Sequence, residues 1–192
     1  MGSRISRATA EAVACLFRAE AAGLFGYAST LPNVSRSDAE DLVQVTFQAA
    51  ATEWDRQLEF LDHESRRRWL YRVLRNKAID QWRTHGSRQV PSERLADVSE
   101  RGHDTYLHAV NSITLKRCWD RIGKMPEARQ RVAFLRWNEE WSSPEIAELL
   151  GISQSTVRAH LKLARDELAE EIGPEVPFAD LGDETSSEGV TW

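Results

Sequence analysis

The feature that most constrains the fold is the stretch of residues 143–157, whose pattern predicts two short helices joined by a tight turn. Ser143 is a suitable N-cap, and Pro144 suits the first position of a helix. Gly151 stands where the turn favours a positive φ, and Ser153 can cap the second helix. Apolar residues then recur along that helix at Val157, Leu161, Ala164 and Leu168. The pattern predicts a helix-turn-helix, which places its second helix in the major groove of DNA.

The exposed side of this second helix carries small, polar and cationic residues that could reach base edges and phosphates. These candidate DNA-binding residues are Gln154, Ser155, Thr156, Arg158, Ala159 and Lys162.

Helical periodicity also dominates the rest of the chain, and convincing period-two alternation is absent, so we predict an all-α protein. A helix or helix pair is expected over 8–30, interrupted near Gly23. The sequence from Ser37 to Glu40 has the form of a capping box. The helix behind it should bury Ala39, Leu42, Val43, Thr46, Phe47 and Ala50 and expose Asp41, Gln44 and Gln48. Further helices are expected over 65–83, 112–122 and 127–137.

The charge distribution is informative although the formal net charge is only -5. The segment 66–83 carries seven basic residues and one acid, Asp80, whereas 173–192 contains five acids and no basic residue. In the helix over 65–83, Arg72, Asn76, Asp80 and Arg83 should lie opposite the apolar stripe of Leu70, Val73, Leu74, Ala78 and Trp82. Such a basic face is typical of a phosphate-binding surface and also of a solvated helix.

The chain should contain two helical domains and a linker. We expect a first domain over 1–85, a linker over 86–111, a helix-turn-helix domain over 112–172, and an acidic, disordered tail over 173–192. The tail either solubilises the protein or inhibits it by covering a basic DNA-binding surface.

Other classes of protein are disfavoured by what the sequence lacks. No run of residues is long and apolar enough to span a membrane, so we expect a cytoplasmic protein. Cys15 and Cys118 form neither a disulfide framework nor a metal site, and we expect both to be buried. No phosphate loop, spaced metal ligands or nucleophile motif indicates an enzyme, and no cofactor is predicted.

Three stretches resemble one family. Residues 38–47, residues 69–80, and residues 126–131 together with the helix-turn-helix are similar, in that order, to the small extracytoplasmic-function (ECF) sigma factors of bacterial RNA polymerase. That resemblance implies a domain called σ2, which binds core polymerase and the -10 promoter element, and a domain called σ4, which binds the -35 element. The implied partners are core RNA polymerase and promoter DNA, and an anti-sigma factor is a third class of partner that the resemblance allows.

The resemblance also implies roles for individual residues. The core-binding residues would be Asp38, Asp41, Gln44 and Gln48. The -10 residues would be Phe60, Arg72, Arg75, Asn76, Lys77, Asp80 and Arg83. Phe60 lies in the stretch 57–64, which corresponds to the family loop that captures a flipped base, and it is either a stacking platform or a core anchor of that loop.

Two other classes of protein are alternatives to a sigma factor. The stretch 156–161 is also similar to response-regulator DNA-binding domains, but the N-terminal half does not alternate strands and helices as a receiver domain would. The second alternative is an enzyme. The chain departs from the family pattern at Val45, His160 and Leu163, where the family commonly has an acid, Arg and Arg.

Overall fold

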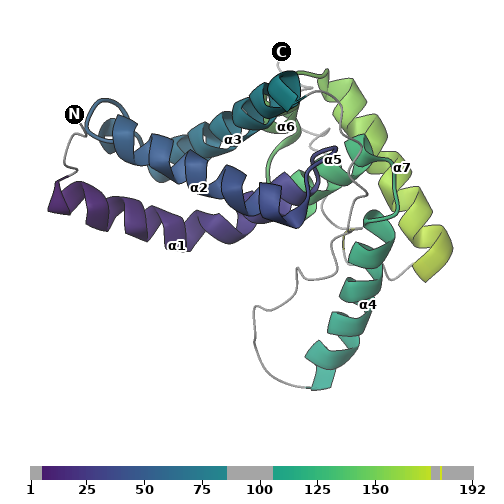
Figure 1. The fold of residues 1–192 in the computed structure, drawn as a ribbon. Helices are drawn as coiled ribbons and strands as arrows, with labels where there is room; N and C mark the ends of the chain where they lie inside the picture. The colour runs from purple at the N-terminus through teal and green to yellow at the C-terminus, as the bar shows by residue number, and fades with distance from the viewer. Residues whose placement is uncertain (1–5, 86–105, 174–177, 179–192) are drawn as a thin grey trace, which may run out of the picture. The chain divides into compact units, whose positions relative to one another are not determined.

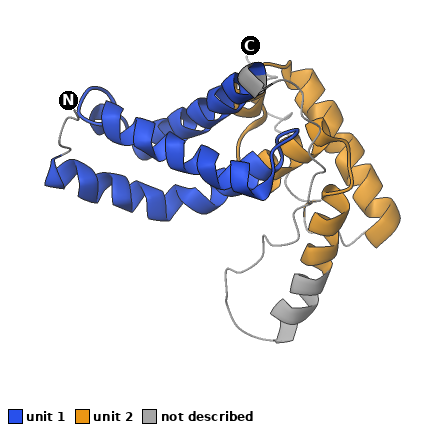
Figure 2. Cartoon of the chain, in the orientation of Figure 1, with its two compact units in different colours: residues 1–94 blue, residues 95–192 orange. Residues whose placement is uncertain are grey.

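The computed structural model describes residues 6–85, 106–173 and 178. The chain divides into two compact units, residues 1–94 and residues 95–192 (Figure 2). The described part of the chain contains helices and no strand, which confirms the all-α prediction. None of the described helices is long and apolar enough to cross a bilayer.

In its described residues, 6–85, unit 1 is a bundle of three long helices. They are α1 (Arg7–Ser29), α2 (Arg36–Glu53) and α3 (His63–His85), and a short 3-10 turn, η1 (Leu58–Phe60), lies between α2 and α3. Helices α1 and α2 lie side by side, and α3 packs against both (Figure 1). This arrangement leaves one side of each helix exposed.

The core of unit 1 combines apolar stripes from the three helices. Every residue predicted to be buried on α2 is buried, and Leu70, Leu74 and Ala78 of α3 are fully buried. Tyr71 is also fully buried, and its ring centroid lies 5.3 Å from that of Tyr27 on α1. The buried face of α3 is therefore wider than the predicted stripe.

Helix α1 is continuous, so the predicted interruption near Gly23 is wrong. A glycine within a helix destabilises it by only about 0.5–1 kcal/mol. Leu24, Tyr27 and Ala28 follow directly and are fully buried against the bundle. Burial of such side chains is worth about 1.5–3 kcal/mol for a residue the size of leucine, which outweighs the effect of one glycine.

Helix α2 begins earlier than the sequence indicated, because the capping box is formed by Ser35 and Asp38 rather than by Ser37 and Glu40. The Asp38 amide donates to Ser35 Oγ (3.2 Å), and Asp38 Oδ2 accepts from the Ser35 amide (3.0 Å). A carboxylate here is also favoured by the positive end of the helix dipole.

Unit 2 is built around its last helix. The described residues of unit 2 form α4 (Tyr106–Ile122), α5 (Glu127–Trp137), α6 (Ser143–Leu150) and α7 (Gln154–Ile172), and α7 contacts each of the other three. The predicted line of Val157, Leu161, Ala164 and Leu168 is buried. Glu167 of α7 forms ion pairs with Arg121 of α4 and Arg129 of α5, which ties the three helices together.

The helix-turn-helix has the predicted turn but a different first cap. Gly151 has φ 70° and ψ 38°, in the left-handed region where glycine is favoured. The N-cap of α6 is Ser142, not Ser143, because Ser142 forms a capping box with Glu145. Ser153 caps α7 by accepting a hydrogen bond from the Thr156 amide (3.1 Å).

Three other expectations concern single positions and the connecting segments. Cys118 is buried, and burial raises the pKa of its thiol, whereas Cys15 is exposed on α1, so its predicted burial is wrong. Helix α4 begins at Tyr106, inside the stretch expected to be linker. Residues 86–105, which make up most of the predicted linker, lie outside the described residues, as does most of the predicted tail. Within the tail only Gly173 and Phe178 are described, and Phe178 is buried against Trp119 and Trp137.

Candidate functional site

The exposed side of α2 carries three of the polar residues assigned to core polymerase. Asp41, Gln44 and Gln48 are all exposed. They follow one another at spacings of three and four residues, so they share one face of the helix. Because the opposite side of α2 forms the core, these three side chains are not needed for the fold.

Asp38 differs from these three residues. It is half-buried, and its carboxylate also accepts a hydrogen bond from Ser35 Oγ (2.6 Å) within the capping box. Its charge therefore stabilises the first turn of α2.

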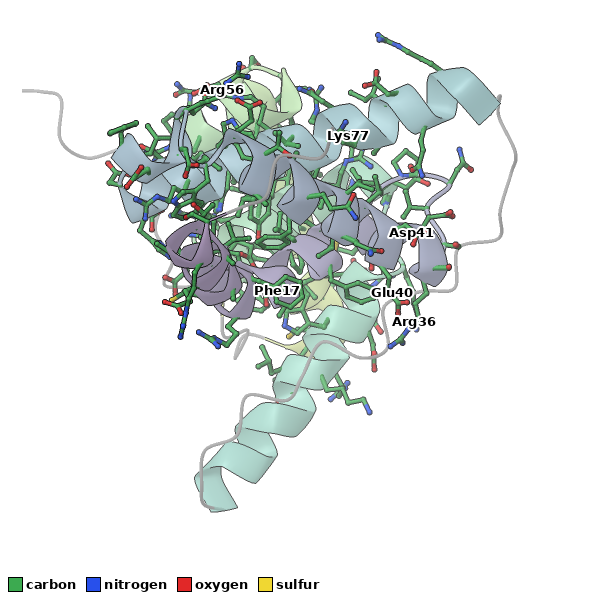
Figure 3. The ribbon with its side chains drawn as sticks, turned by 60° about the vertical axis from the view of Figure 1, so that its left-hand side comes forward. Phe17, Arg36, Glu40, Asp41, Arg56 and Lys77 are labelled. Carbon is green, nitrogen blue, oxygen red and sulfur yellow. The ribbon has the colours of Figure 1, made fainter. Side chains whose placement is uncertain are left out.

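An apolar groove runs beside this face, between α1 and α2. Its volume is about 720 Å³. It is lined by Phe17, Ala21, Ala22 and Phe25 of α1 and by Glu40, Val43, Gln44, Phe47, Gln48 and Ala51 of α2. Phe17 is 47% exposed although its ring packs edge-on against Phe47, with centroids 4.9 Å apart. Figure 3 shows Phe17 on α1 and, toward one end of α2, Arg36, Glu40 and Asp41.

The groove was not predicted from the sequence. Its signal is the pair Phe17 and Phe25, which lie two turns apart on α1, outside the stripe of Leu16 and Leu24 that enters the core. A second apolar line on one helix indicates a face that the bundle does not cover.

The outer side of α3 is polar and basic, as predicted. Arg72, Asn76, Lys77, Asp80 and Arg83 are exposed, and Arg75 is half-buried. Figure 3 labels Lys77 on α3. Arg83 Nη1 lies 3.8 Å from Asp80 Oδ1, so the one acid of this face offsets part of the charge near the end of the helix.

The three arginines at the start of the basic segment make contacts within unit 1. Arg67 Nε lies 3.5 Å from Oε2 of Glu20, a buried carboxylate on α1, and Arg68 Nη2 donates to Ser65 Oγ (3.2 Å). Arg66 donates to backbone carbonyls of the preceding loop. The local positive charge counted in the sequence therefore overestimates the charge of the exposed α3 face.

Glu20 was missed in the sequence. It lies four residues after Leu16 and four before Leu24, which are both buried. An acid in the apolar stripe of a helix indicates a buried carboxylate with a cationic partner.

Two apolar residues of the loop between α2 and α3, Leu58 and Phe60, differ in their exposure. Leu58 is fully buried, whereas Phe60 is 77% exposed. The interpretation of Phe60 as a core anchor is therefore wrong, because Leu58 anchors the loop. Asp62 closes the loop by accepting a hydrogen bond from the Ser65 amide (2.6 Å) at the start of α3. That hydrogen bond lowers the pKa of the Asp62 carboxyl.

All six residues predicted to contact DNA from α7 are exposed. They are Gln154, Ser155, Thr156, Arg158, Ala159 and Lys162. Ser153 Oγ also lies 2.7 Å from Ser155 Oγ and 2.8 Å from Thr156 Oγ1, so the first turn of α7 is held by a hydroxyl cluster. The amino-terminal turns of α7 thus form an exposed surface with two cations, Arg158 and Lys162.

The two positions of α7 that depart from the family pattern differ in environment. His160 is half-buried, and burial, with the neighbouring charges of Arg129 and Arg131, lowers its pKa. Leu163 is 48% exposed. Neither residue adds a positive charge at neutral pH to the surface formed by Arg158 and Lys162.

Comparisons with known proteins agree with both units. The family described as "Sigma-70 region 2" matches residues 16–88, and "Sigma-70, region 4" matches residues 117–168. These ranges cover α2 and α3 in unit 1 and the helix-turn-helix in unit 2.

Two curated relatives and one solved structure are similar to the chain. The RNA polymerase sigma factor YlaC of Bacillus subtilis is 34% identical over 135 residues, which cover 68% of this chain and 75% of the relative. The ECF RNA polymerase sigma-E factor of Haemophilus influenzae is 32% identical over 151 residues, covering 73% and 78%. The sigma factor RpoE of Bartonella quintana, solved in complex with the anti-sigma factor NepR, has a TM-score of 0.58 at 19% identity and covers 86% of this chain and 96% of that one.

The solved structure supports the fold, and the curated relatives, matched over more than two thirds of their own length, determine the family. With the exposed faces of α2, α3 and α7 in the family's order, the chain belongs to the ECF group of the sigma-70 family of RNA polymerase sigma factors.

Proposed function

We propose that this sigma factor works through three surfaces, one for core polymerase and two for promoter DNA. As a sigma factor it is a non-catalytic initiation factor that binds core RNA polymerase and directs it to specific promoters. The proposal assigns the face of α2 and the adjacent groove to core polymerase. It assigns the outer side of α3 with the 57–62 loop to the -10 element, and the exposed side of α7 to the -35 element. The protein acts in the cytoplasm, together with the polymerase.

The α2 surface suits a helical partner. An apolar groove bordered by polar side chains accepts an amphipathic helix, whose apolar side enters the groove while its polar side meets the border. Here the border includes Glu40, Gln44 and Gln48, with Asp41 beside them. The acidic residues favour a basic partner helix on core polymerase. An anti-sigma factor that covered this surface would block assembly.

The α3 surface suits DNA that is beginning to separate. Arg72, Lys77 and Arg83 are exposed and can approach phosphates of the duplex. The exposed ring of Phe60 can stack on a base that has left the duplex, and stacking of this kind is worth about 1–3 kcal/mol per base. The combination supports both binding and melting of the -10 element.

The α7 surface suits the major groove of an intact duplex. Ser155 and Ala159 are small and exposed, so the helix can approach base edges closely, while Arg158 and Lys162 can reach bases or phosphates. This geometry supports sequence-specific binding at the -35 element.

One observation carries the proposal. On α2, α3 and α7, the sequence separates a stripe that the fold buries from an exposed polar or basic face. Three such faces in one chain, in the order of the family, support one function, the assembly of a promoter complex.

Transcription by the purified protein with core polymerase on genomic DNA tests the proposal, with sequencing of the transcripts. Transcripts that start downstream of shared pairs of sequence elements are expected. Transcripts without any shared upstream sequence would contradict promoter recognition by α3 and α7.

Assembly with core polymerase tests the α2 surface separately. The double substitution Asp41→Arg with Gln44→Arg should abolish binding to core polymerase and leave the helix content unchanged. The pair Glu11→Arg and Ala19→Arg is the matched control, because it adds the same charge at exposed positions of α1. Tight binding by the α2 variant would show that this face is not the core-binding surface.

A further inference from the structure

Arg66 connects the three parts of unit 1 that meet at the loop between α2 and α3. Its Nε donates to the Leu58 carbonyl (2.7 Å), and its Nη2 donates to the Glu59 carbonyl (3.0 Å). The guanidinium carbon lies 5.1 Å from the ring centroid of Trp54, which caps the end of α2. One half-buried side chain at the start of α3 thus holds the 3-10 turn and the end of α2.

The geometry requires a guanidinium. The Leu58 carbonyl accepts from the Leu61 amide within the turn and has a second lone pair for an outside donor, and the Glu59 carbonyl accepts from Arg66. The planar fork of arginine presents several N–H groups at once and can also stack on an aromatic ring. A lysine ammonium keeps the charge, but as a compact point charge it does not match both acceptors and the ring together.

The turn is fixed on its other side by backbone hydrogen bonds. The Glu59 amide donates to the Trp54 carbonyl (2.9 Å), and the Leu61 amide donates to the Leu58 carbonyl (3.2 Å). Leu58 is fully buried beneath the turn. With Arg66 holding the carbonyls, the backbone on both sides of Phe60 has defined partners.

This arrangement explains how the aromatic side chain of Phe60 remains exposed to solvent. Phe60 is 77% exposed, although it is two residues from a fully buried leucine. A loop without these constraints could turn the ring toward apolar surface, since burial of a phenylalanine side chain is worth about 1.5–3 kcal/mol. A loop fixed before binding also loses less conformational entropy when a ligand stacks on it.

We propose that Arg66 is a positioning residue for base capture: it holds the 57–62 loop so that Phe60 is presented to an unpaired base of the displaced strand. This inference rests on the proposed role of the loop at the -10 element. Arg66 belongs to the basic segment that the sequence identifies as a candidate phosphate-binding surface. In this proposal its charge acts on the protein's own loop and not on DNA.

The first measurement uses the protein alone and does not depend on its role in promoter binding. Amide hydrogen exchange is compared for wild type, Arg66→Lys and Arg56→Lys, where Arg56 is an exposed arginine near the same loop and is the matched control. Arg66→Lys should increase exchange at residues 59–61 by at least about tenfold, with unchanged exchange in the buried parts of α1–α3. Exchange at residues 59–61 equal to that of wild type would show that Arg66 does not hold the loop, and would overturn the inference.

The second measurement uses holoenzyme and a single-stranded oligonucleotide carrying the non-template -10 strand of a promoter mapped with the wild-type protein. Phe60→Ala and Arg66→Lys should each weaken binding by about fivefold or more, the range expected for losing one stacked base. Because both changes remove the same contact, the double variant should bind no more weakly than Phe60→Ala. The salt dependence of Arg66→Lys should equal that of wild type.

The outcomes separate the two proposals. If Phe60→Ala weakens binding and Arg66→Lys does not, the loop captures a base but Arg66 does not position it. If Arg66→Ala reduces the salt slope by about one while Arg66→Lys restores it, Arg66 is a phosphate contact and the inference is wrong. If Phe60→Ala has no effect, the proposed role of the loop fails and the inference fails with it, whatever hydrogen exchange shows.

Discussion

Arg158 and Lys162 lie one turn apart on the exposed side of α7, yet they should affect DNA binding differently. Arg158 is nearer the amino-terminal end of the helix, the part of a recognition helix that reaches base edges. Arg158→Ala should weaken binding to the -35 element by about 1–3 kcal/mol and relax specificity at one position. Lys162→Ala should weaken binding to all sequences similarly and lower the salt slope by about one.

Measurements of holoenzyme affinity for a set of -35 variants at several salt concentrations would distinguish these effects. Lys116→Ala, at an exposed position of α4, is the control and should change neither quantity. Unchanged binding of Arg158→Ala to every variant would show that another part of α7 reads the bases.

His160 provides a prediction about pH. Burial, together with Arg129 and Arg131, lowers its pKa below the usual value for histidine, so the folded protein binds this proton less readily than the unfolded chain. Stability from this residue is present above the unfolded pKa and is lost as the pH falls toward the lower, folded pKa. The melting temperature should therefore fall between about pH 7.5 and pH 5.5, in the range where a normal histidine titrates.

Comparison with His160→Gln isolates the contribution of this residue from those of the other histidines. The variant should show a smaller fall in melting temperature over the same pH range. An identical pH dependence for the two proteins would mean that His160 titrates normally.

At the scale of helices, the elements and their buried faces could be predicted, but the caps could not all be located. Ser35 and Ser37 are each followed by an acid three residues later, so the sequence pattern of a capping box fits both starts of α2. For α6 the sequence favours Ser142 over Ser143 as the N-cap, because only Ser142 is followed by a glutamate at the third position of the helix. Where two candidates match equally, the choice depends on packing of the first turn.

The loop and the groove show why parts of the site could not be predicted. Periodicity does not apply to a short irregular turn, so it could not decide that Leu58 is buried and Phe60 exposed. It also could not show that Arg66 and Arg67 contact the loop carbonyls and Glu20, since those contacts join residues from different elements. Charge counting identifies cations but not their partners.

Phe178 extends unit 2 beyond its last helix. Its ring is stacked on Trp137, with centroids 4.7 Å apart, and meets Trp119 edge-on at 5.7 Å. Only 6% of the residue is exposed. Phe178→Ala should lower the free energy of unfolding of unit 2 by about 3 kcal/mol, as is typical for a buried phenylalanine.

Urea unfolding followed by near-ultraviolet circular dichroism would measure this effect, because the tryptophans lose an aromatic neighbour. Phe60→Ala is the control, and its exposed ring should contribute little to stability. Similar unfolding curves for wild type and Phe178→Ala would show that the stacking is not a stable part of the fold in solution.

At the scale of the whole chain, the charges are separated between the basic face of α3 and the acidic C-terminal residues. Asp180, Asp183, Glu184 and Glu188 follow Phe178, and the last basic residue before them is Arg165. Because Phe178 packs against Trp119 and Trp137 within unit 2, a truncation that tests the role of the acids must retain it. Removal of residues 180–192 meets that condition.

If the acidic residues compete with DNA for basic surfaces of the protein, removing them should increase DNA binding. The truncated protein, without polymerase, should bind promoter duplex more tightly than the full-length chain at low salt. The difference should shrink as salt increases, because the screening length falls from about 30 Å at 0.01 M to about 10 Å at 0.1 M. A second variant, in which the four acids are replaced by Asn and Gln at full length, should behave like the truncation if charge is the cause. Tighter binding by the truncation alone would indicate an effect of length, and equal affinity of all three proteins at low salt would show that the acidic residues do not regulate DNA binding.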